Sequence, residues 1–422
     1  MSKIPGWLRW LPVTLGRGAK NAVFRALGPL VRGRAPRGPL APRRILVLQL
    51  QQLGDSVIFT PTLRALRERF PEATIDLLAS PVAAQIYRKS PYLNRIVVAR
   101  SWSTAPGGTR IRPMLPLLRE LREAGYDMTV TDLAQQSFKY TLVARLIGAP
   151  ARVGFDIGGR GFLHNVRVPF RADAHWVDAN LDIVRTLGGT PRSDREEVAF
   201  DATDRARVEA LLDVEQGRAG KPLVVMHTGS NWQSRTWYVE RWVSLADTLG
   251  SRHGATIVFV GGAAEKEYVE RIRAGMTRRS ISLAGVTDIP QLAALCTIAD
   301  VFVGTDSGPR QIARASGCPH VVVMSAQDDT DRWAGWGRGE VVVRSFPPCH
   351  GCYYAHCAHK ICMDAIETDR ILAWVEALLA DKSARTAASR QERLGIPPRL
   401  EPMAAKGKAA LRVLAHGPAS PD

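Results

Sequence analysis

VFVGTDSGP, residues 301–309, is the stretch that decides the fold. Its apolar beginning predicts a buried strand, which runs into a polar turn and then, near Arg310, into a helix. Pro309 suits the first helical turn, and Gly308 lets a ligand approach the backbone. The free N–H groups and the helix dipole at such a turn attract a diphosphate. A merely well-capped helix is the alternative, and Asp306 favours a site because its carboxylate can accept hydrogen bonds from ligand hydroxyls.

Strands and helices alternate on both sides of this stretch. Short apolar runs predict strands, and amphipathic stretches that fit helices lie between them. The predicted strands are residues 45–48, 74–78, 95–99 and 128–131 in the first half and 223–226, 256–260, 301–304, 320–324 and 341–343 in the second. Strands that alternate with crossover helices form parallel sheets, and ligands bind such sheets at the carboxyl ends of the strands. The sequence therefore predicts an α/β protein with two Rossmann-like domains that face each other across a cleft.

Chain length supports two domains. The chain has 422 residues, more than the roughly 250–300 at which one core usually stops growing. Its 45% hydrophobic and 23% charged residues exclude a collagen-like or globally disordered chain. The expected segments are a basic N-terminal tail (1–42), an N-terminal Rossmann-like domain (43–200), a linker (201–220), a C-terminal Rossmann-like domain (221–382) and a flexible basic C-terminal tail (383–422).

The net charge of +17 lies mainly in the two tails. Residues 1–44 hold ten Lys or Arg and no acid, and residues 383–422 hold seven bases and three acids. A nucleic-acid-binding domain is expected to carry its charge on the folded body, so we expect no nucleic-acid partner. Anionic lipid suits the N-terminal tail better, because Ile4, Trp7 and Leu8 lie among the bases near helical spacing. A disordered basic leader is the alternative.

Membrane-spanning segments are not expected. No stretch approaches the roughly 20 uncharged apolar residues that a spanning helix needs, and Pro5, Arg9 and Pro12 make the start a poor signal peptide. We therefore expect a cytoplasmic protein that is peripheral to the inner membrane.

A second polar turn, Gly54-Asp55-Ser56, follows the first predicted strand of the other half. A carboxylate at this position can take the proton of an acceptor hydroxyl while that oxygen attacks the anomeric carbon of a sugar, which is general-base catalysis. The alternative is that Asp55 or Ser56 only caps the following helix.

Two more polar turns follow strands of the second half. Thr228 and Arg235 lie in the loop after residues 223–226, where a hydroxyl and a planar guanidinium can bind phosphate oxygens. Glu265 follows Gly261-Gly262 after residues 256–260, and it can either accept ribose hydroxyls or favour a helix N-terminus.

In this order, the four turns resemble glycosyltransferase family nine, the bacterial heptosyltransferases of the lipopolysaccharide inner core. The resemblance covers roughly residues 43–380 and rests on residues 50–66, 227–237, 261–265 and 305–315. It implies a GT-B fold, with the acceptor glycolipid on the N-terminal domain and the sugar nucleotide, typically ADP-heptose, on the C-terminal domain.

The resemblance also implies roles for individual residues. Asp55 becomes the general base, Arg235 the cation near the diphosphate and Glu265 a nucleoside contact, with Thr228 in the same donor-binding loop. Asp306, Ser307 and Gly308 become contacts of the donor sugar and its diphosphate. Two positions depart from the family pattern: Gln311 replaces the His of Gly-Pro-x-His, and Thr236 replaces the second base of Lys-Arg-Trp-Pro. These departures put the donor in doubt more than the class of reaction.

The six cysteines form two groups. Cys296 and Cys318 lie in apolar contexts and are expected in the core. The other four, Cys349, Cys352, Cys357 and Cys362, fall within fourteen residues among three histidines. Reduced thiols at this spacing suit a structural zinc or an iron–sulfur cluster. Disulfides, free thiols and a metal-free staple of the last loop are the alternatives.

Together these features predict an inverting glycosyltransferase that moves a heptose or a similar sugar from a nucleotide diphosphate donor onto a lipopolysaccharide core or another lipid-linked saccharide. No cofactor is expected for catalysis. The alternatives are the same fold with another donor or acceptor, and a non-catalytic homologue that binds sugar nucleotides.

Overall fold

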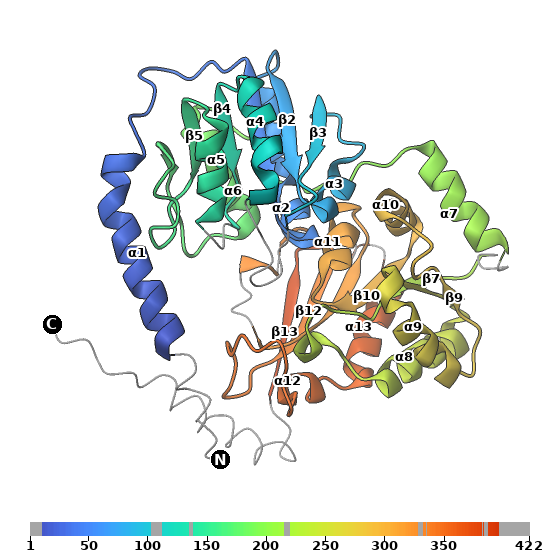
Figure 1. The fold of residues 1–422 in the computed structure, drawn as a ribbon. Coiled ribbons are helices and arrows are strands. Elements are labelled where there is room, and N and C mark those ends of the chain that lie inside the picture. The colour runs from blue at the N-terminus through green and yellow to red at the C-terminus, as the bar shows by residue number, and fades with distance from the viewer. Residues whose placement is uncertain are drawn as a thin grey trace. The chain divides into compact units, whose positions relative to one another are not determined.

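A computed structural model describes residues 11–102, 112–134, 138–214, 220–327, 332–334, 336–381, 383 and 387–395. The chain divides into two compact units, Met1–Glu196 and Glu197–Asp422 (Figure 1). This boundary precedes the linker expected at 201–220. Most of that segment is instead the helix α7 (Ala202–Val214), which packs on α10 (Ile289–Ile298) and thus belongs to the second unit.

The first unit is built on a parallel six-stranded sheet. Its strands are β1 (Arg44–Gln49), β2 (Thr74–Ala79), β3 (Arg95–Val98), β4 (Met128–Thr131), β5 (Ala151–Phe155) and β6 (Val166–Val168). Their order is β3-β2-β1-β4-β5-β6, which is the Rossmann order and reverses between β1 and β4. All four predicted strands of this half are confirmed. The last two strands were not predicted because Arg152, Gly154 and Arg167 interrupt their short apolar runs.

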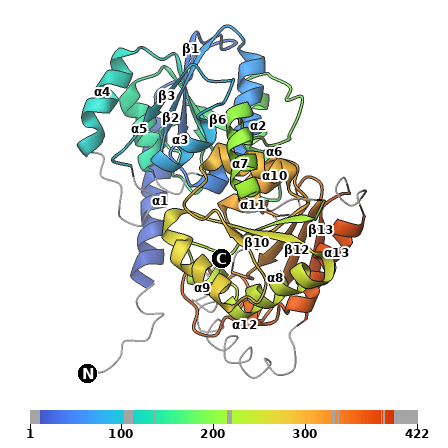
Figure 2. The same ribbon diagram turned by 90° about the vertical axis from the view of Figure 1, so that its right-hand side faces the viewer.

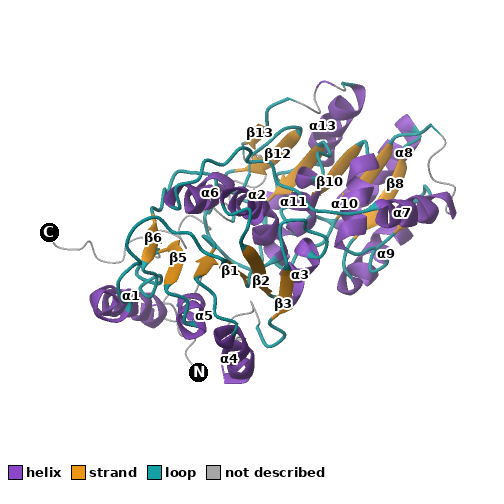
Figure 3. Ribbon diagram, turned by 90° about the horizontal axis from the view of Figure 1, so that it is seen from above, coloured by secondary structure: helices purple, strands orange, loops and turns teal. Residues whose placement is uncertain are grey.

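Helices cover both faces of this sheet, as the view from above shows (Figure 3). They are α1 (Leu11–Val31), α2 (Leu53–Arg69), α3 (Pro81–Tyr87), α4 (Leu115–Glu123), α5 (Lys139–Ile147) and α6 (Trp176–Thr186), and a single 3-10 turn, Arg112–Met114, precedes α4. Helices α4 and α5 bury their apolar residues with Leu46, Leu48 and Leu78 of the sheet. Helices α2 and α6 pack against each other.

The second unit repeats the plan with seven parallel strands (Figure 2). They are β7 (Leu223–His227), β8 (Thr256–Val260), β9 (Ile281–Ser282), β10 (Val301–Thr305), β11 (His320–Met324), β12 (Glu340–Ser345) and β13 (Arg390–Leu394). The order β13-β12-β11-β10-β7-β8-β9 reverses between β7 and β10. The five strands predicted for this half are confirmed.

The remaining helices of the second unit are α8 (Val239–His253), α9 (Lys266–Gly275), α11 (Gly308–Ala315), α12 (Ile361–Asp364) and α13 (Thr368–Ala380), with 3-10 turns at Gln233–Arg235 and Ala263–Glu265. The main core cluster joins α8, α9 and α13 to the sheet, and Trp237 and Trp242 pack edge to face within it. Cys296 and Cys318 are buried as expected.

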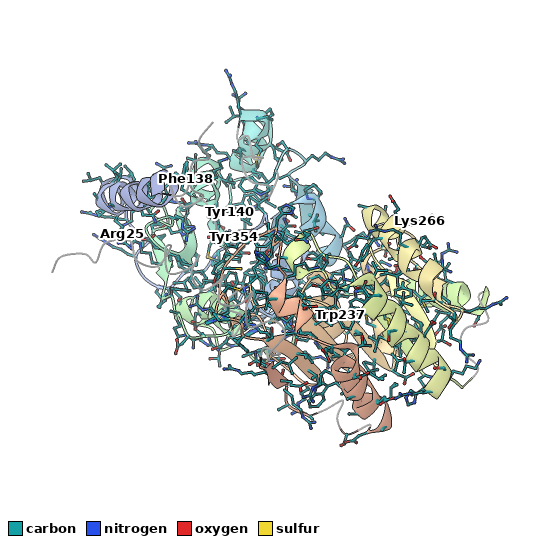
Figure 4. The ribbon with its side chains drawn as sticks, turned by 90° about the horizontal axis from the view of Figure 1, so that it is seen from below. Arg25, Phe138, Tyr140, Trp237, Lys266 and Tyr354 are labelled. Carbon is teal, nitrogen blue, oxygen red and sulfur yellow. The ribbon has the colours of Figure 1, made fainter. Side chains whose placement is uncertain are left out.

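Both segments expected to be tails are partly folded. In α1, Phe24 stacks on Phe162 with ring centroids 4.7 Å apart and also contacts Phe138, which Figure 4 shows beside this helix. The flexible C-terminal tail expected at 383–422 is wrong for β13, because its backbone extends the sheet edge beside β12 and Glu392 accepts a hydrogen bond from Trp374 Nε1. Residues 1–10 and 396–422 lie outside the described residues.

No helix within the described residues is long and apolar enough to cross a membrane.

Candidate functional site

Polar side chains gather where the strand order reverses in each unit. In the second unit this point lies between β7 and β10, which pair in parallel with Gly304 opposite His227. The chain leaves these strands at Thr228 and Asp306. Thr305 Oγ1 donates to the carbonyl of Gly229 at 2.5 Å, so the two strand ends are tied together. Ligands of open α/β sheets bind at such reversal points.

His227 links two of the predicted donor-binding residues. Its Nδ1 lies 3.0 Å from Ser307 Oγ, and its Nε2 lies 3.2 Å from Glu265 Oε1. Glu265 also accepts the backbone N–H of Gly262 at 2.7 Å. Burial raises the pKa of Glu265, but the hydrogen bonds from His227 and Gly262 outweigh it and hold the pKa below its usual value. Sequence reasoning named Glu265 and Ser307 but not the histidine that joins them.

Gly229 makes this arrangement sterically possible. A Cβ atom at this position would lie 1.6 Å from Glu265 Oε1. The close approach of backbone and carboxylate therefore requires glycine at position 229.

Asp306 is held by two arginines. Its Oδ1 accepts Arg310 Nη2 at 3.1 Å, and its Oδ2 lies 3.5 Å from Arg235 Nη1. Arg235 also donates through Nε to Gln327 Oε1 at 2.9 Å and lies over the ring of Trp232. The carboxylate and the cation named from the sequence are therefore in contact with each other. Gln327, which was not predicted, fixes the guanidinium of Arg235 in place.

Arg310 connects Asp306 to a cluster of buried charged side chains. The side chains of Arg310 and Glu340 are fully buried, and Arg310 Nη1 donates to Glu340 Oε1 at 2.6 Å. The same oxygen lies 3.1 Å from His320 Nε2. Burial raises the pKa of Glu340, but the positive charges of Arg310, His320 and Arg314 outweigh it and hold the pKa well below its usual value. The charge of Arg310 is thus committed to Glu340 and Asp306.

The structure shows the surroundings of Gln311 and Thr236, the two positions that depart from the family pattern. Gln311 is buried, and its Oε1 is among the buried polar atoms of the described residues that make no hydrogen bond, as is Thr228 Oγ1. Thr236 Oγ1 accepts a hydrogen bond from Lys360 Nζ at 3.1 Å. A positive charge from a later segment therefore stands beside the position where the family's second base is missing.

Asp55 lies at the reversal point of the first unit, in the first turn of α2 after β1. Burial raises the pKa of Asp55 to about 7, although hydrogen bonds from the backbone N–H groups of Gln52 and of Asp55 itself lower it. These hydrogen bonds mean that the carboxylate also helps to cap α2, as the alternative interpretation expected. A pKa near neutrality suits a general base, because the group is then both ionised and basic at the working pH.

Asp132 is a second carboxyl group at the same reversal point, and sequence reasoning missed it. It directly follows β4, the neighbour of β1, and it is buried. Burial is the larger cause, and the charge of Asp55 the smaller, that together raise the pKa of Asp132 to about 8. The signal was available, because the strand at 128–131 was predicted and an acid at its carboxyl end shares an edge with the turn after β1.

The four clustered cysteines lie in the loop between β12 and α12 and at the start of α12. All are free thiols, so the disulfide alternative is not observed. Burial is the largest cause that raises the pKa of Cys349 to about 11, and the charges of the other three thiols add to it. Within the described ranges no group of three or more His, Cys, Asp or Glu side chains is arranged to hold a metal ion. The loop instead supports the 3-10 turn Gln233–Arg235, because Ser234 N–H donates to the carbonyl of Ala355 and Cys357 N–H donates to Gln233 Oε1.

Comparison with known proteins places this architecture in one family. The family model described as glycosyltransferase family 9 (heptosyltransferase) matches residues 114–362. Lipopolysaccharide heptosyltransferase 3 of Escherichia coli is 25% identical over 298 residues, which cover 68% of this chain and 85% of that protein.

Two solved structures share the fold. A glycosyl transferase family 9 protein from Veillonella parvula aligns with a TM-score of 0.68 and 20% identity, covering 80% of this chain and 97% of that one. The E. coli ADP-heptose LPS heptosyltransferase II aligns with a TM-score of 0.65 and 21% identity, covering 81% and 99%. Since the family model matches more than half of its length, this chain belongs to glycosyltransferase family 9, the heptosyltransferases, and is a glycosyltransferase with the GT-B fold.

Proposed function

We propose that this enzyme transfers a heptose, with inversion at the anomeric carbon, from ADP-heptose onto a lipopolysaccharide core or another lipid-linked saccharide. The observation that carries the proposal is the pair of polar reversal points. One offers a near-neutral carboxyl group, Asp55, and the other offers a linked set of anion-binding and hydroxyl-binding groups around Asp306. The relatives named for lipopolysaccharide and ADP-heptose favour this donor and acceptor class.

The second unit binds the donor in this proposal. Arg235 and the N-terminus of α11, with Ser307 and Gly308, bind the diphosphate, since a guanidinium and free helical N–H groups both attract phosphate oxygens. Asp306 accepts hydrogen bonds from the sugar while its two arginines hold its carboxylate in place. Glu265 accepts hydrogen bonds from the ribose hydroxyls, and the unpartnered hydroxyl of Thr228 is available to a phosphate oxygen.

Catalysis then takes one displacement. The acceptor hydroxyl oxygen forms a bond to the anomeric carbon while the bond from that carbon to the diphosphate oxygen breaks. Asp55 takes the proton of the hydroxyl, and ADP leaves with both electrons of the broken bond. Arg235 and the dipole of α11 stabilise the charge that develops on the diphosphate, which is the kind of electrostatic stabilisation that contributes most to many enzymes.

The N-terminal helix suits binding to an anionic membrane surface. Four exposed apolar residues of α1, Val23, Leu27, Leu30 and Val31, recur at helical spacing, whereas Phe24 packs inward. No acid accompanies the ten bases of residues 1–44. We propose that this helix holds the enzyme at the cytoplasmic face of the inner membrane. Co-sedimentation with phosphatidylglycerol vesicles should fall in a variant with Leu27→Ser and Leu30→Ser, and equal binding would end this proposal.

We also propose that the four clustered thiols close on a structural zinc or iron–sulfur cluster. The four cysteines fall within fourteen residues, and burial and then the charges of neighbouring thiols raise the pKa of Cys349 and of Cys362. In the described residues the sulfurs are not arranged as a metal site, so the proposal requires the loop to close around the metal. Elemental analysis of the purified protein should find about one metal site per chain, since four thiolates complete one tetrahedral shell. Metal-free protein with full activity would leave the loop as a metal-free staple.

Titration calorimetry with ADP, UDP and GDP tests the donor assignment. The enzyme should prefer ADP, and Asp306→Asn should weaken binding of ADP-heptose by roughly 10- to 100-fold, the usual range for a hydrogen bond to a charged group. Asp247→Asn is the matched control, because this carboxylate of the same unit accepts hydrogen bonds from the N–H and hydroxyl groups of Thr277 and from the N–H group of Arg278. A preference for UDP or GDP would favour another sugar donor. Binding of no nucleotide would contradict the donor assignment.

A further inference from the structure

Two carboxyl groups lie at the reversal point of the first sheet. Asp55 follows β1 and Asp132 follows β4, and these strands pair in parallel with Leu48 opposite Thr131. Parallel neighbours end at the same edge, so the two acids stand at the same side of the sheet. The charge of Asp55 raises the pKa of Asp132, in agreement with this placement.

Asp132 is held rigidly from the β1 side. Gln49 Nε2 donates to its Oδ2 at 2.9 Å, and Gln51 Nε2 lies 3.3 Å from its Oδ1. Gln51 also donates to the carbonyl of Ala134 at 2.8 Å, which fixes the amide between the two strand ends. The side chains of Gln49, Gln51 and Asp132 are all buried. Both carboxylate oxygens of this acid are therefore bound by buried amide groups.

The same amides connect Asp132 to the helix that carries Asp55. Ser56 Oγ donates to the backbone carbonyl of Gln52 at 2.9 Å and lies 3.4 Å from Gln49 Oε1. The hydroxyl of Tyr87 donates to the carbonyl of Ser56 at 2.6 Å. The first turn of α2 is thus fixed to the network that holds Asp132.

Two tyrosines are the other titratable groups that act with this pair. Tyr87 comes from α3 and Tyr140 from α5, and Tyr140 donates to the carbonyl of Leu50 at 2.9 Å. Burial raises the pKa of each tyrosine, and the charges of both aspartates raise it further. Both phenols therefore stay neutral across the working pH range, and only the aspartates change charge.

We propose that Asp132 is a positioning residue for the general base Asp55, and that the two acids act as a coupled pair that carries a single proton near neutral pH. This inference rests on the proposed function of Asp55. When one acid is ionised, its charge disfavours ionisation of the other, so the pair loses its two protons in separate steps. In the state with one proton, one carboxylate is ionised and can take the proton of the acceptor hydroxyl, and only above the second ionisation do both acids carry charge.

The directions of the two ionisations agree with this geometry. Burial raises the pKa of Asp55 to about 7. Burial, and then the charge of Asp55, raises the pKa of Asp132 to about 8, while Gln49 and Gln51 lower it. Between these values the pair holds one proton, and we assign that proton to the pair because the two sites are coupled.

The pH dependence of kcat/KM tests the pair. In the wild type the acidic limb should spread over both ionisations, between about pH 7 and about pH 8. In Asp132→Asn the acidic limb of the pH profile should narrow to one ionisation, with its midpoint at lower pH. If Asp132 had a purely structural role, its substitution would lower kcat/KM without changing the shape of the pH profile. Asp127→Asn is the matched control, because this carboxylate only accepts the N–H groups of Arg43 and Arg44. An identical profile for wild type and Asp132→Asn would overturn the proposal.

A second measurement needs neither donor nor acceptor. The melting temperature is measured for the wild type, Asp55→Asn, Asp132→Asn and the double variant. The pH runs from about 5 to about 9, which covers the ionisation of both aspartates. Each raised pKa makes the folded state bind more protons, so the wild type should lose stability as the pH rises. The changes in melting temperature of the two single variants should sum to more than the change of the double variant, because each single substitution already removes the repulsion between the two carboxylates. Additive changes in melting temperature would overturn the proposal of a coupled pair. This test needs no turnover, so the coupled pair and the catalytic role of Asp55 can fail separately.

A milder variant covers the case in which Asp132→Asn does not fold. Gln51→Met keeps both carboxyl groups but removes a hydrogen bond that lowers the pKa of Asp132. The upper ionisation should then move to higher pH in both measurements. An upper ionisation that stays in place would overturn the proposal.

Discussion

The buried ion pair of Arg310 and Glu340 allows a prediction with a defined magnitude. In Glu340→Gln the side chain keeps its shape but loses its charge, and the guanidinium of Arg310 remains fully buried with Asp306 as a charged neighbour. Removing one partner of a buried pair costs about 3–5 kcal/mol, because the other charge is left uncompensated. His320 also loses its carboxylate partner. Because Asp306 still compensates part of the charge of Arg310, we expect the lower part of this range for the loss in the free energy of unfolding of the second unit.

The matched control is Glu270→Gln. Glu270 pairs with Arg273 at 2.6 Å, but both side chains are partly exposed, at 43% and 30%. Exposed ion pairs contribute only about 0–1 kcal/mol, so this variant should unfold almost like the wild type. Urea denaturation followed by pulsed hydrogen exchange, read on peptides from β10 and β12, measures the second unit alone.

The pH dependence gives the sign of the effect. The folded pKa of Glu340 lies well below its usual value. Its charge therefore stabilises the fold above the unfolded pKa, and this contribution is lost as the pH falls through the folded value. The difference between wild type and Glu340→Gln should be full at pH 7 and shrink only in strong acid. A cost below about 1 kcal/mol at pH 7, equal to that of an exposed pair, would refute this reasoning.

Three further outcomes follow from close contacts. Gly229→Ala places a Cβ 1.6 Å from Glu265 Oε1, so calorimetry should find ADP binding weakened about tenfold, the equivalent of 1.4 kcal/mol. Gly154→Ala places a Cβ 2.1 Å from Thr131 Oγ1, and chemical denaturation should show a loss of about 1–3 kcal/mol from overpacking. Phe24→Ala removes the ring stack that holds α1, so hydrogen exchange over residues 21–31 should become faster while β1 is unchanged.

The sequence predicted the sheets well because the central strands are uniformly apolar. Residues 45–48 and 301–304 are buried on both faces, and such strands appear as continuous apolar runs. Strand β13 could not be predicted in this way. Its residues are mostly charged, and they pair through the backbone at a sheet edge, where side chains need little burial.

The candidate site was predictable where one turn contains the chemistry. Asp306 and Ser307 follow a strand directly, and the motif around them predicts a donor site. The contacts that fix them come from distant segments: Gln327 holds Arg235 across 92 residues, and Glu340 holds Arg310 across 30. Such partners depend on strand order, which a single sequence does not specify. Asp132, by contrast, could have been found, because the strand at 128–131 was predicted and this acid directly follows it.

Turnover is the most direct test of the central claim that this chain transfers heptose by general-base catalysis at Asp55. The enzyme is supplied with ADP-heptose and a heptose-deficient lipopolysaccharide core, and both the release of ADP and the mass of the product are measured. We predict transfer by the wild type, and in Asp55→Asn a rate lower by about 10²–10⁴-fold with unchanged affinity for ADP-heptose. Transfer by Asp55→Asn at the wild-type rate, or tight binding of ADP-heptose by the wild type without transfer to any such core, would contradict the account.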